Sequence, residues 1–173
     1  MRRYARHRVI RREEGTMKAG YAVLVVLVAA LTLTSVAAAG PNVTKQRVAI
    51  IATGLGPSAP APWELTPLQA GALEADSGTE TATFKSRVVR RGGLSVRLLE
   101  WTTTMKGKRG TLVMRVLEEH VPVGNGYSVF IGTWKVLRGT GQYANLTGGG
   151  RELGVINNVQ RWNNRREGVL TVG

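Results

Sequence analysis

GTWKVLRGTGQYANLTGGG, residues 132–150, combines many glycines with the bulky side chains of Tyr143 and Leu146. Gly139 and Gly141 permit close turns and a left-handed backbone. Tyr143 and Leu146 are three residues apart, so one helical turn would point both side chains the same way. The stretch lacks the Lys-Ser/Thr ending of a phosphate-binding loop, and no helical pattern follows it. We therefore predict a folded-back loop whose tyrosine and leucine close one end of an apolar interior.

Short segments with two-residue alternation of apolar and polar residues lie on both sides of this loop. Turn signals rich in glycine, asparagine and aspartate separate them. The predicted strands are residues 45–51, 64–74, 80–90, 94–105, 111–121, 127–137, 150–161 and 165–172. Even spacing with short links favours an antiparallel meander, and closure into a barrel would remove exposed edges. The chain is thus predicted to be all-β.

The hairpin formed by residues 94–105 and 111–121 allows a register to be predicted. If its turn is centred on Lys108, the apolar faces of both strands coincide, and Glu100 and Glu118 continue that face toward one end of the barrel. The other face then pairs Trp101 with Arg115 as a cation–π contact, and Arg97 with Glu119 as an ion pair. This register satisfies both faces at once.

The sequence of residues 132–150 resembles the G-T-W-x-x-x-x-G-T-G-x-Y-x-x-L-x-G-x-G signature of small secreted bacterial proteins of unassigned function. These are similar to the allene oxide cyclase-like and dirigent-like barrels. KGKRGTLVMR (106–115) and VGNGYSVFIGTW (123–134) fit the same pattern. The resemblance covers residues 64–173 and implies an eight-stranded antiparallel barrel, calycin-like or allene oxide cyclase-like. It also implies a hydrophobic barrel interior that holds a fatty-acid epoxide or phenolic radicals. The site residues of neither family can be placed on this chain by motif.

The N-terminal region has the pattern of a secretory signal. A basic segment precedes the uncharged residues 21–36, and a small-residue site of the A-x-A kind ends at Ala39. We predict a signal helix in a signal peptide over residues 1–39, with Met17 as an alternative start, and a secreted or extracytoplasmic protein. An uncleaved membrane anchor is the alternative. A linker with a short strand is expected at 40–62, and the barrel domain at 63–173.

Cleavage after Ala39 would leave 134 residues with 17 basic and 9 acidic side chains, a net charge of +8. This length suits a single domain with a sizeable core. The chain has no cysteine, which excludes disulfides and a thiolate nucleophile. Its arginine clusters fall at predicted turns, where they are either solvated or contact anionic cell-envelope polymers. A specific nucleic-acid partner is not expected for an exported chain.

Few residues suggest catalysis. Glu100 and Glu118 could bind a ligand hydroxyl or cation, act as an acid/base pair, or pair with arginine at a wet barrel mouth. His120 is the only histidine after the leader, so no metal site and no cofactor are predicted. No G-x-S-x-G nucleophile motif occurs. The candidate ligand-binding residues, in the cavity or at the barrel mouth, are Glu100, Met114, Glu118, Trp134, Tyr143 and Leu146.

The leading functional hypothesis is non-catalytic binding of a small apolar or amphipathic molecule in the barrel. One alternative is an isomerase or cyclase of the allene oxide cyclase or dirigent type that uses the same cavity. Another is a basic surface module that contacts anionic envelope polymers through its arginine loops.

Overall fold

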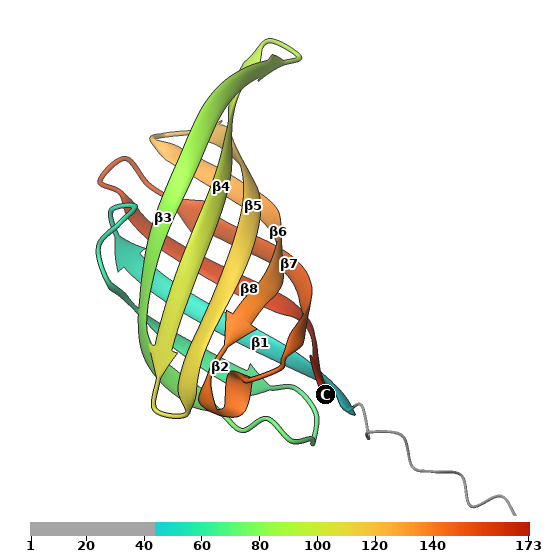
Figure 1. The fold of residues 1–173 in the computed structure, drawn as a ribbon. Helices are drawn as coiled ribbons and strands as arrows, with labels where there is room; N and C mark the ends of the chain where they lie inside the picture. The colour runs from blue at the N-terminus through green and yellow to red at the C-terminus, as the bar shows by residue number, and fades with distance from the viewer. Residues whose placement is uncertain (1–43) are drawn as a thin grey trace, which may run out of the picture. The chain divides into compact units, whose positions relative to one another are not determined.

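A computed structural model of the protein describes residues 44–173, and the predicted signal peptide and signal helix lie outside them. The described residues form eight antiparallel strands in a single sheet (Figure 1). Each strand pairs with its neighbour in sequence, and β1 pairs with β8, so the sheet closes into a barrel. Among these residues, no helix has the length and apolar content needed to span a membrane.

The strands are long, and a single 3₁₀ turn interrupts their succession in this part of the chain. The elements are β1 (Thr44–Leu55), β2 (Ala61–Pro67), β3 (Asp76–Arg91), β4 (Leu94–Gly107), β5 (Gly110–Gly124), β6 (Tyr127–Gly139), η1 (Gly141–Tyr143), β7 (Thr147–Ile156) and β8 (Arg161–Val172). The prediction of an all-β chain with eight antiparallel strands is confirmed. The segment predicted as a linker, 40–62, contains β1, which pairs along its length with β8.

The predicted register of the β4–β5 hairpin is wrong by one residue. Gly107 pairs with Gly110 around a two-residue turn, whereas the prediction assumed a turn centred on Lys108. Because side chains alternate between the two faces of a strand, a slip of one residue exchanges the inner and outer sets of β4. Trp101 therefore pairs with Val116 and faces inward, and Glu100 points outward.

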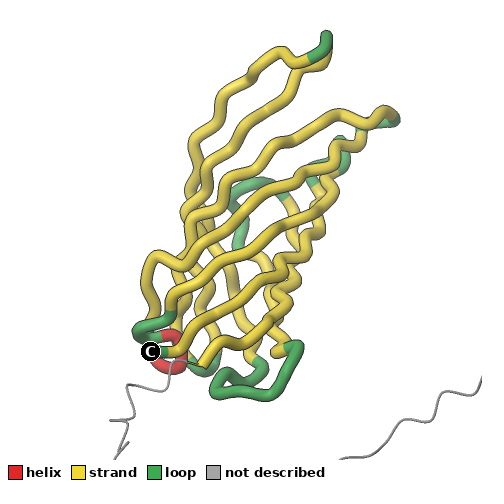
Figure 2. The backbone as a smooth tube through the Cα atoms, turned by 90° about the vertical axis from the view of Figure 1, so that its right-hand side faces the viewer, coloured by secondary structure: helices red, strands yellow, loops and turns green. Residues whose placement is uncertain are grey.

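One end of the barrel is closed, as the sequence predicted from residues 132–150. Tyr143 of η1 is fully buried and Leu146 is 5% exposed, and both belong to the apolar core. Figure 2 shows η1, in red, at the end of the barrel that also holds the C-terminus. The β2–β3 loop helps to cover this end, because the buried side-chain amide of Gln46 accepts from the backbone N–H of Leu73 and donates to its carbonyl.

The core of the closed end consists of buried apolar side chains from β1, β2, β4, β5, β6 and β8, from η1 and from two loops. They are Val48, Ile50, Ala52, Trp63, Leu65, Leu73, Met105, Leu112, Met114, Val116, Trp134, Tyr143, Leu146 and Leu170.

The opposite end is open and is bordered by the β1–β2, β3–β4, β5–β6 and β7–β8 turns (Figure 1). The β3–β4 hairpin projects beyond the other strands there. The register of β3 with β2 ends at Glu80, so residues 81–91 pair with β4 alone. Several charged and aromatic side chains lie inside this open end, which we call the mouth.

Candidate functional site

The mouth contains a pocket of about 110 Å³. Its lining combines aromatic rings, charged side chains and a few aliphatic groups from six of the eight strands, β3 to β8, and the adjoining turns. The lining residues are Pro57, Glu80, Ala82, Phe84, Arg97, Leu99, Trp101, Thr103, Glu118, His120, Phe130, Ile156, Gln160, Trp162, Asn164 and Arg166. The alternation of each strand places these side chains on the inner face, directly above the apolar core.

Aromatic rings form the walls of the pocket. Phe84 of β3 and Trp101 of β4 are directly paired across their strands, with ring centroids 4.5 Å apart. The Phe130 ring lies against β7 at Gly154, where an added Cβ would collide with it. Trp162 is held by a 2.8 Å hydrogen bond from its indole N–H to the carbonyl of Gly56. Rings held in this way provide a preformed apolar surface.

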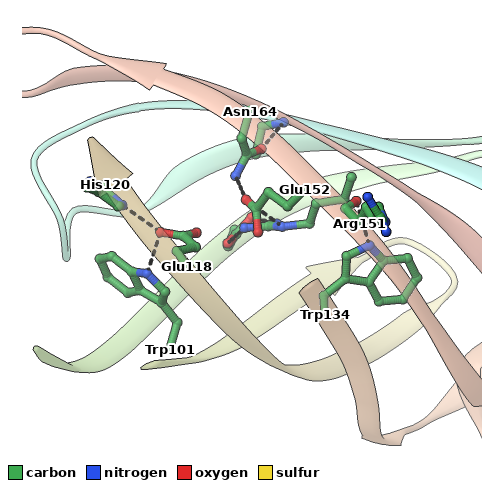
Figure 3. A network of polar contacts seen from close by, with 10 residues as sticks. Trp101, Glu118, His120, Trp134, Arg151, Glu152 and Asn164 are labelled. Atoms are coloured by element: carbon green, nitrogen blue, oxygen red, sulfur yellow. Dashed lines mark hydrogen bonds and ion pairs between the residues drawn. The ribbon is translucent and has the colours of Figure 1, made fainter. Parts of the chain in front are cut away.

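A buried ion-pair network forms the floor. The guanidinium of Arg166 donates two hydrogen bonds to the carboxylate of Glu80, at 2.8 and 3.0 Å, and one from Nε to Glu152 at 3.1 Å. Asn164 donates to the same Glu152 oxygen at 2.6 Å, and its own carbonyl accepts from the backbone N–H of Ala52 (Figure 3). This network joins β3, β7 and β8 across the inside of the barrel.

A second cluster of hydrogen-bonded side chains lies beside this network. The indole N–H of Trp101 donates to Oε2 of Glu118 at 2.8 Å, and Nε2 of His120 lies 2.8 Å from the same oxygen (Figure 3). The His120 ring stacks on Phe130 at a centroid distance of 4.8 Å. The side chains of His120 and Glu118 are 14% and 5% exposed, so this pair is largely shielded from water.

Burial sets the ionisation of the network. It raises the pKa of Glu152 to about 7, because the ion pair with Arg166 offsets only part of the lost hydration, and the charges of Glu118 and Glu80 raise it further. Burial would lower the pKa of Arg166, but the carboxylates of Glu152 and Glu80 outweigh it and raise that pKa. Arg166 therefore stays charged, and Glu152 takes up a proton near neutral pH.

Two buried polar atoms near the mouth lack a hydrogen-bond partner. One is Oγ1 of Thr103, whose side chain lines the pocket in a residue only 2% exposed. The other is Oε2 of Glu152. Buried polar groups are nearly always satisfied in folded proteins, so exceptions point to a bound water or ligand.

The structure separates the six residues predicted from the sequence. Glu118 lines the pocket. Four of the other predicted residues belong to the core of the closed end and do not line the pocket; they are Met114, Trp134, Tyr143 and Leu146. Glu100 was predicted to share the inner face with Glu118, and that prediction is wrong: its carboxylate lies 2.8 Å from Arg115 on the outer surface, because the register differs by one residue.

Sequence reasoning missed Glu80, Glu152 and Arg166. Arg166 lies within β8, inside the predicted strand 165–172, and was not among the candidate ligand-binding residues. The alternation of Trp162, Asn164 and Arg166 with outward residues was a usable signal, since the same face continues to the core residue Leu170. Nothing local to Arg166 indicates Glu80, which lies 86 positions away in the chain.

A larger hollow, of about 990 Å³, lies on the outer surface across β3 to β8. Its apolar part consists of the exposed side chains of Leu117, Ile131 and Leu153. Among its charged side chains, Arg165 pairs with Glu167, while Glu100 and Glu119 pair with Arg115 and Arg91. We place the candidate site in the mouth, because the buried and unpartnered hydroxyl of Thr103 lines the pocket there.

Within residues 44–173, no group of three or more histidine, aspartate or glutamate side chains is arranged to hold a metal ion. Comparison of the chain with protein-family models, with curated proteins and with solved structures gives no match.

Proposed function

We propose that the protein binds a small amphipathic molecule at the mouth of the barrel, without catalysis. The observation that carries this proposal is the position of the pocket: aromatic walls lead to a buried polar floor that includes the unpartnered hydroxyl of Thr103. The sequence suggested a ligand in the barrel interior. The closed end is filled by its own side chains, so the available space lies in the mouth.

The size of the pocket limits the part of the ligand that enters it. A cavity of roughly 150 Å³ can hold a benzene molecule, and drug-sized ligands occupy roughly 300–1,000 Å³. The volume of about 110 Å³ is smaller than both, so one ring or a short branched chain would enter only in part, next to Trp101 and Trp162. The remainder of a larger molecule would extend into solvent between the turns.

The test uses benzyl alcohol, a neutral probe with one ring and one hydroxyl. Titration of the purified ¹⁵N-labelled protein should move the indole N–H signals of Trp101 and Trp162, which line the pocket. The signals of Trp63 and Trp134, buried in the closed end, serve as internal controls. Saturable shifts confined to the first pair support the proposal, and the absence of any saturable shift contradicts it.

A second candidate function is proton transfer of the isomerase or cyclase type. Its specific support is the 2.8 Å contact of His120 with Glu118 inside a pocket that could admit a substrate. A carboxylate that orients an imidazole is the usual arrangement of a general base. Phenylacetone in D₂O tests it: catalysed loss of the methylene proton signal, abolished in His120→Gln, supports this function. Exchange at the buffer rate excludes it for this probe.

The relation to the allene oxide cyclase-like and dirigent-like barrels remains our proposal, as does export from the cytoplasm. The first is supported by the eight-stranded antiparallel ring and by the buried Tyr143 and Leu146 of the glycine-rich motif. The second is supported by the sequence pattern of residues 1–39. Detection of a mature chain that begins after Ala39, by N-terminal sequencing of exported protein, tests the second.

A further inference from the structure

The buried groups around the mouth pocket carry more negative than positive charge. Glu80, Glu118 and Glu152 are 4%, 6% and 3% exposed. Arg166, at 3%, is the only arginine or lysine buried with them in residues 44–173. Even with Glu152 protonated, the two carboxylates of Glu80 and Glu118 are buried with one guanidinium. Charge inside a protein is poorly screened, so this excess acts directly on a bound molecule.

Arg166 does not provide a site for an anion. Each of its three nitrogen atoms already donates to a carboxylate, two to Glu80 and one to Glu152. Two of its five N–H donors remain, but a ligand carboxylate or phosphate that reached them would lie close to the Glu80 carboxylate, which repels it. Arg97 also lines the pocket, but it is exposed, so water and salt screen its charge.

The groups that remain available favour a donor with a positive charge. Oγ1 of Thr103 is buried without a partner and can accept a hydrogen bond. Two carboxylates line the pocket, those of Glu80 and Glu118. Arg166 pairs with Glu80, whereas Oε2 of Glu118 contacts Trp101 and His120. The rings of Phe84, Trp101 and Trp162 in the walls present π-faces, and such faces attract cations as well as apolar groups.

We propose that the polar end of the ligand is a small organic cation, a primary amine in its ammonium form that carries one compact apolar or aromatic group. Its ammonium lies among Glu118, Thr103 and the indole of Trp101, and its apolar part contacts the aromatic walls. This inference rests on the proposed binding function and specifies its ligand class.

The experiment compares three probes of similar size: benzylamine, benzyl alcohol and benzoate. Their affinities are measured at pH 7.5 from the shifts of the Trp101 and Trp162 indole signals. We expect benzylamine to bind at least tenfold more tightly than benzyl alcohol, and benzoate to bind more weakly than both. Equal or tighter binding of the alcohol or of benzoate overturns the inference and leaves the binding function intact. Binding of none of the three overturns both.

Substitutions test whether the charge of Glu118 makes benzylamine bind more tightly than benzyl alcohol. Glu118→Gln should lower benzylamine affinity at least tenfold and change benzyl alcohol affinity by less than threefold. Glu100→Gln is the matched control, because Glu100 lies on the outer surface of the adjacent strand, paired with Arg115. Equal loss in the two variants, or no loss in Glu118→Gln, overturns the inference.

Thr103→Val provides a second variant for the case in which Glu118→Gln does not fold. It replaces a buried hydroxyl that has no partner by a methyl group of the same shape, so the fold should be retained or stabilised. We expect it to reduce benzylamine affinity about threefold or more. Unchanged benzylamine affinity in a folded Thr103→Val protein overturns the assigned position of the ammonium.

Discussion

Asp76, at the start of β3, joins three segments of the closed end. Its carboxylate accepts from the Tyr143 hydroxyl at 2.9 Å and from the backbone N–H groups of Ser77, Lys108 and Arg109. Burial would raise the pKa of Asp76, but these hydrogen bonds outweigh it and hold the pKa below its ordinary value. Burial, together with the Asp76 carboxylate, raises the pKa of the Tyr143 hydroxyl, so Tyr143 remains a donor.

Asp76→Asn is therefore expected to lower the free energy of unfolding by about 2 kcal/mol, since an amide has one acceptor oxygen where the carboxylate has two. Urea denaturation at pH 7 measures the loss. Because the pKa is lowered in the folded state, the contribution of Asp76 is present above its ordinary pKa of 3.8 and disappears as the pH falls below it. Tyr143→Phe, which removes one of the four donors, should cost less. A loss below about 0.5 kcal/mol in Asp76→Asn would contradict this role.

At the scale of elements, the two-residue turn between β4 and β5 decides which side chains reach the pocket. Alternation along each strand was compatible with two registers, and both placed apolar residues on a common face. The backbone N–H groups of Lys108 and Arg109 both point to the Asp76 carboxylate, which stabilises the shorter turn. This contact comes from a segment 32 residues earlier in the chain, so the hairpin sequence does not contain it.

The part of β3 beyond its pairing with β2 is the strand edge most exposed to pairing with a second protein molecule. Residues 81–91 have a partner strand on one side only, and Lys85, Arg87 and Arg91 place positive charge along them. Charged side chains are a common protection of such edges. Replacing Lys85 and Arg87 together by threonine should produce concentration-dependent association, measured by sedimentation velocity. The same exchange at Lys135 of β6 and Arg151 of β7, which are paired with strands on both sides, should leave the protein unchanged. Equal behaviour of the two variants would refute this explanation.

At the scale of the molecule, the two ends of the barrel interior differ: the closed end is apolar and the open end contains buried charged groups. The closed end buries a continuous apolar cluster, which supplies most of the hydrophobic stabilisation. The open end buries ionised groups, whose mutual attraction only offsets their loss of hydration. Such a network adds little stability, and it keeps carboxylates and aromatic rings in fixed positions around a space that a small molecule can enter.

The burial of Glu152 predicts that the stability of the folded protein depends on pH near neutrality. The pKa of Glu152 is raised from 4.5 to about 7 by burial, against the charge of Arg166 and with further increase from Glu118 and Glu80. The folded state thus holds this proton more tightly than the unfolded chain. The free energy of unfolding should fall as the pH rises from about 4.5 to 7 and level off above that range.

Urea denaturation at pH 5 and pH 8 measures this difference. Glu152→Gln keeps the shape of the side chain without its titration, and should reduce the difference between the two pH values. Glu100→Gln, on the outer surface, should leave the difference unchanged. An equal pH dependence in Glu152→Gln and in the unmodified protein would contradict the assignment.

The sequence by itself determined the all-β class, the eight strands and the closure of one end by Tyr143 and Leu146, because alternation, turn residues and glycine-rich loops act over a few neighbouring positions. Only the tertiary structure decided the β4–β5 register and the composition of the mouth. Arg166 of β8 meets Glu80 of β3 only when the sheet closes and brings distant strands to a common interior. Glu118 meets Trp101 only in the register that the β4–β5 hairpin adopts. Ion pairs and hydrogen bonds of this kind depend on positions in space, and neither partner marks its local sequence with a pattern that identifies the other.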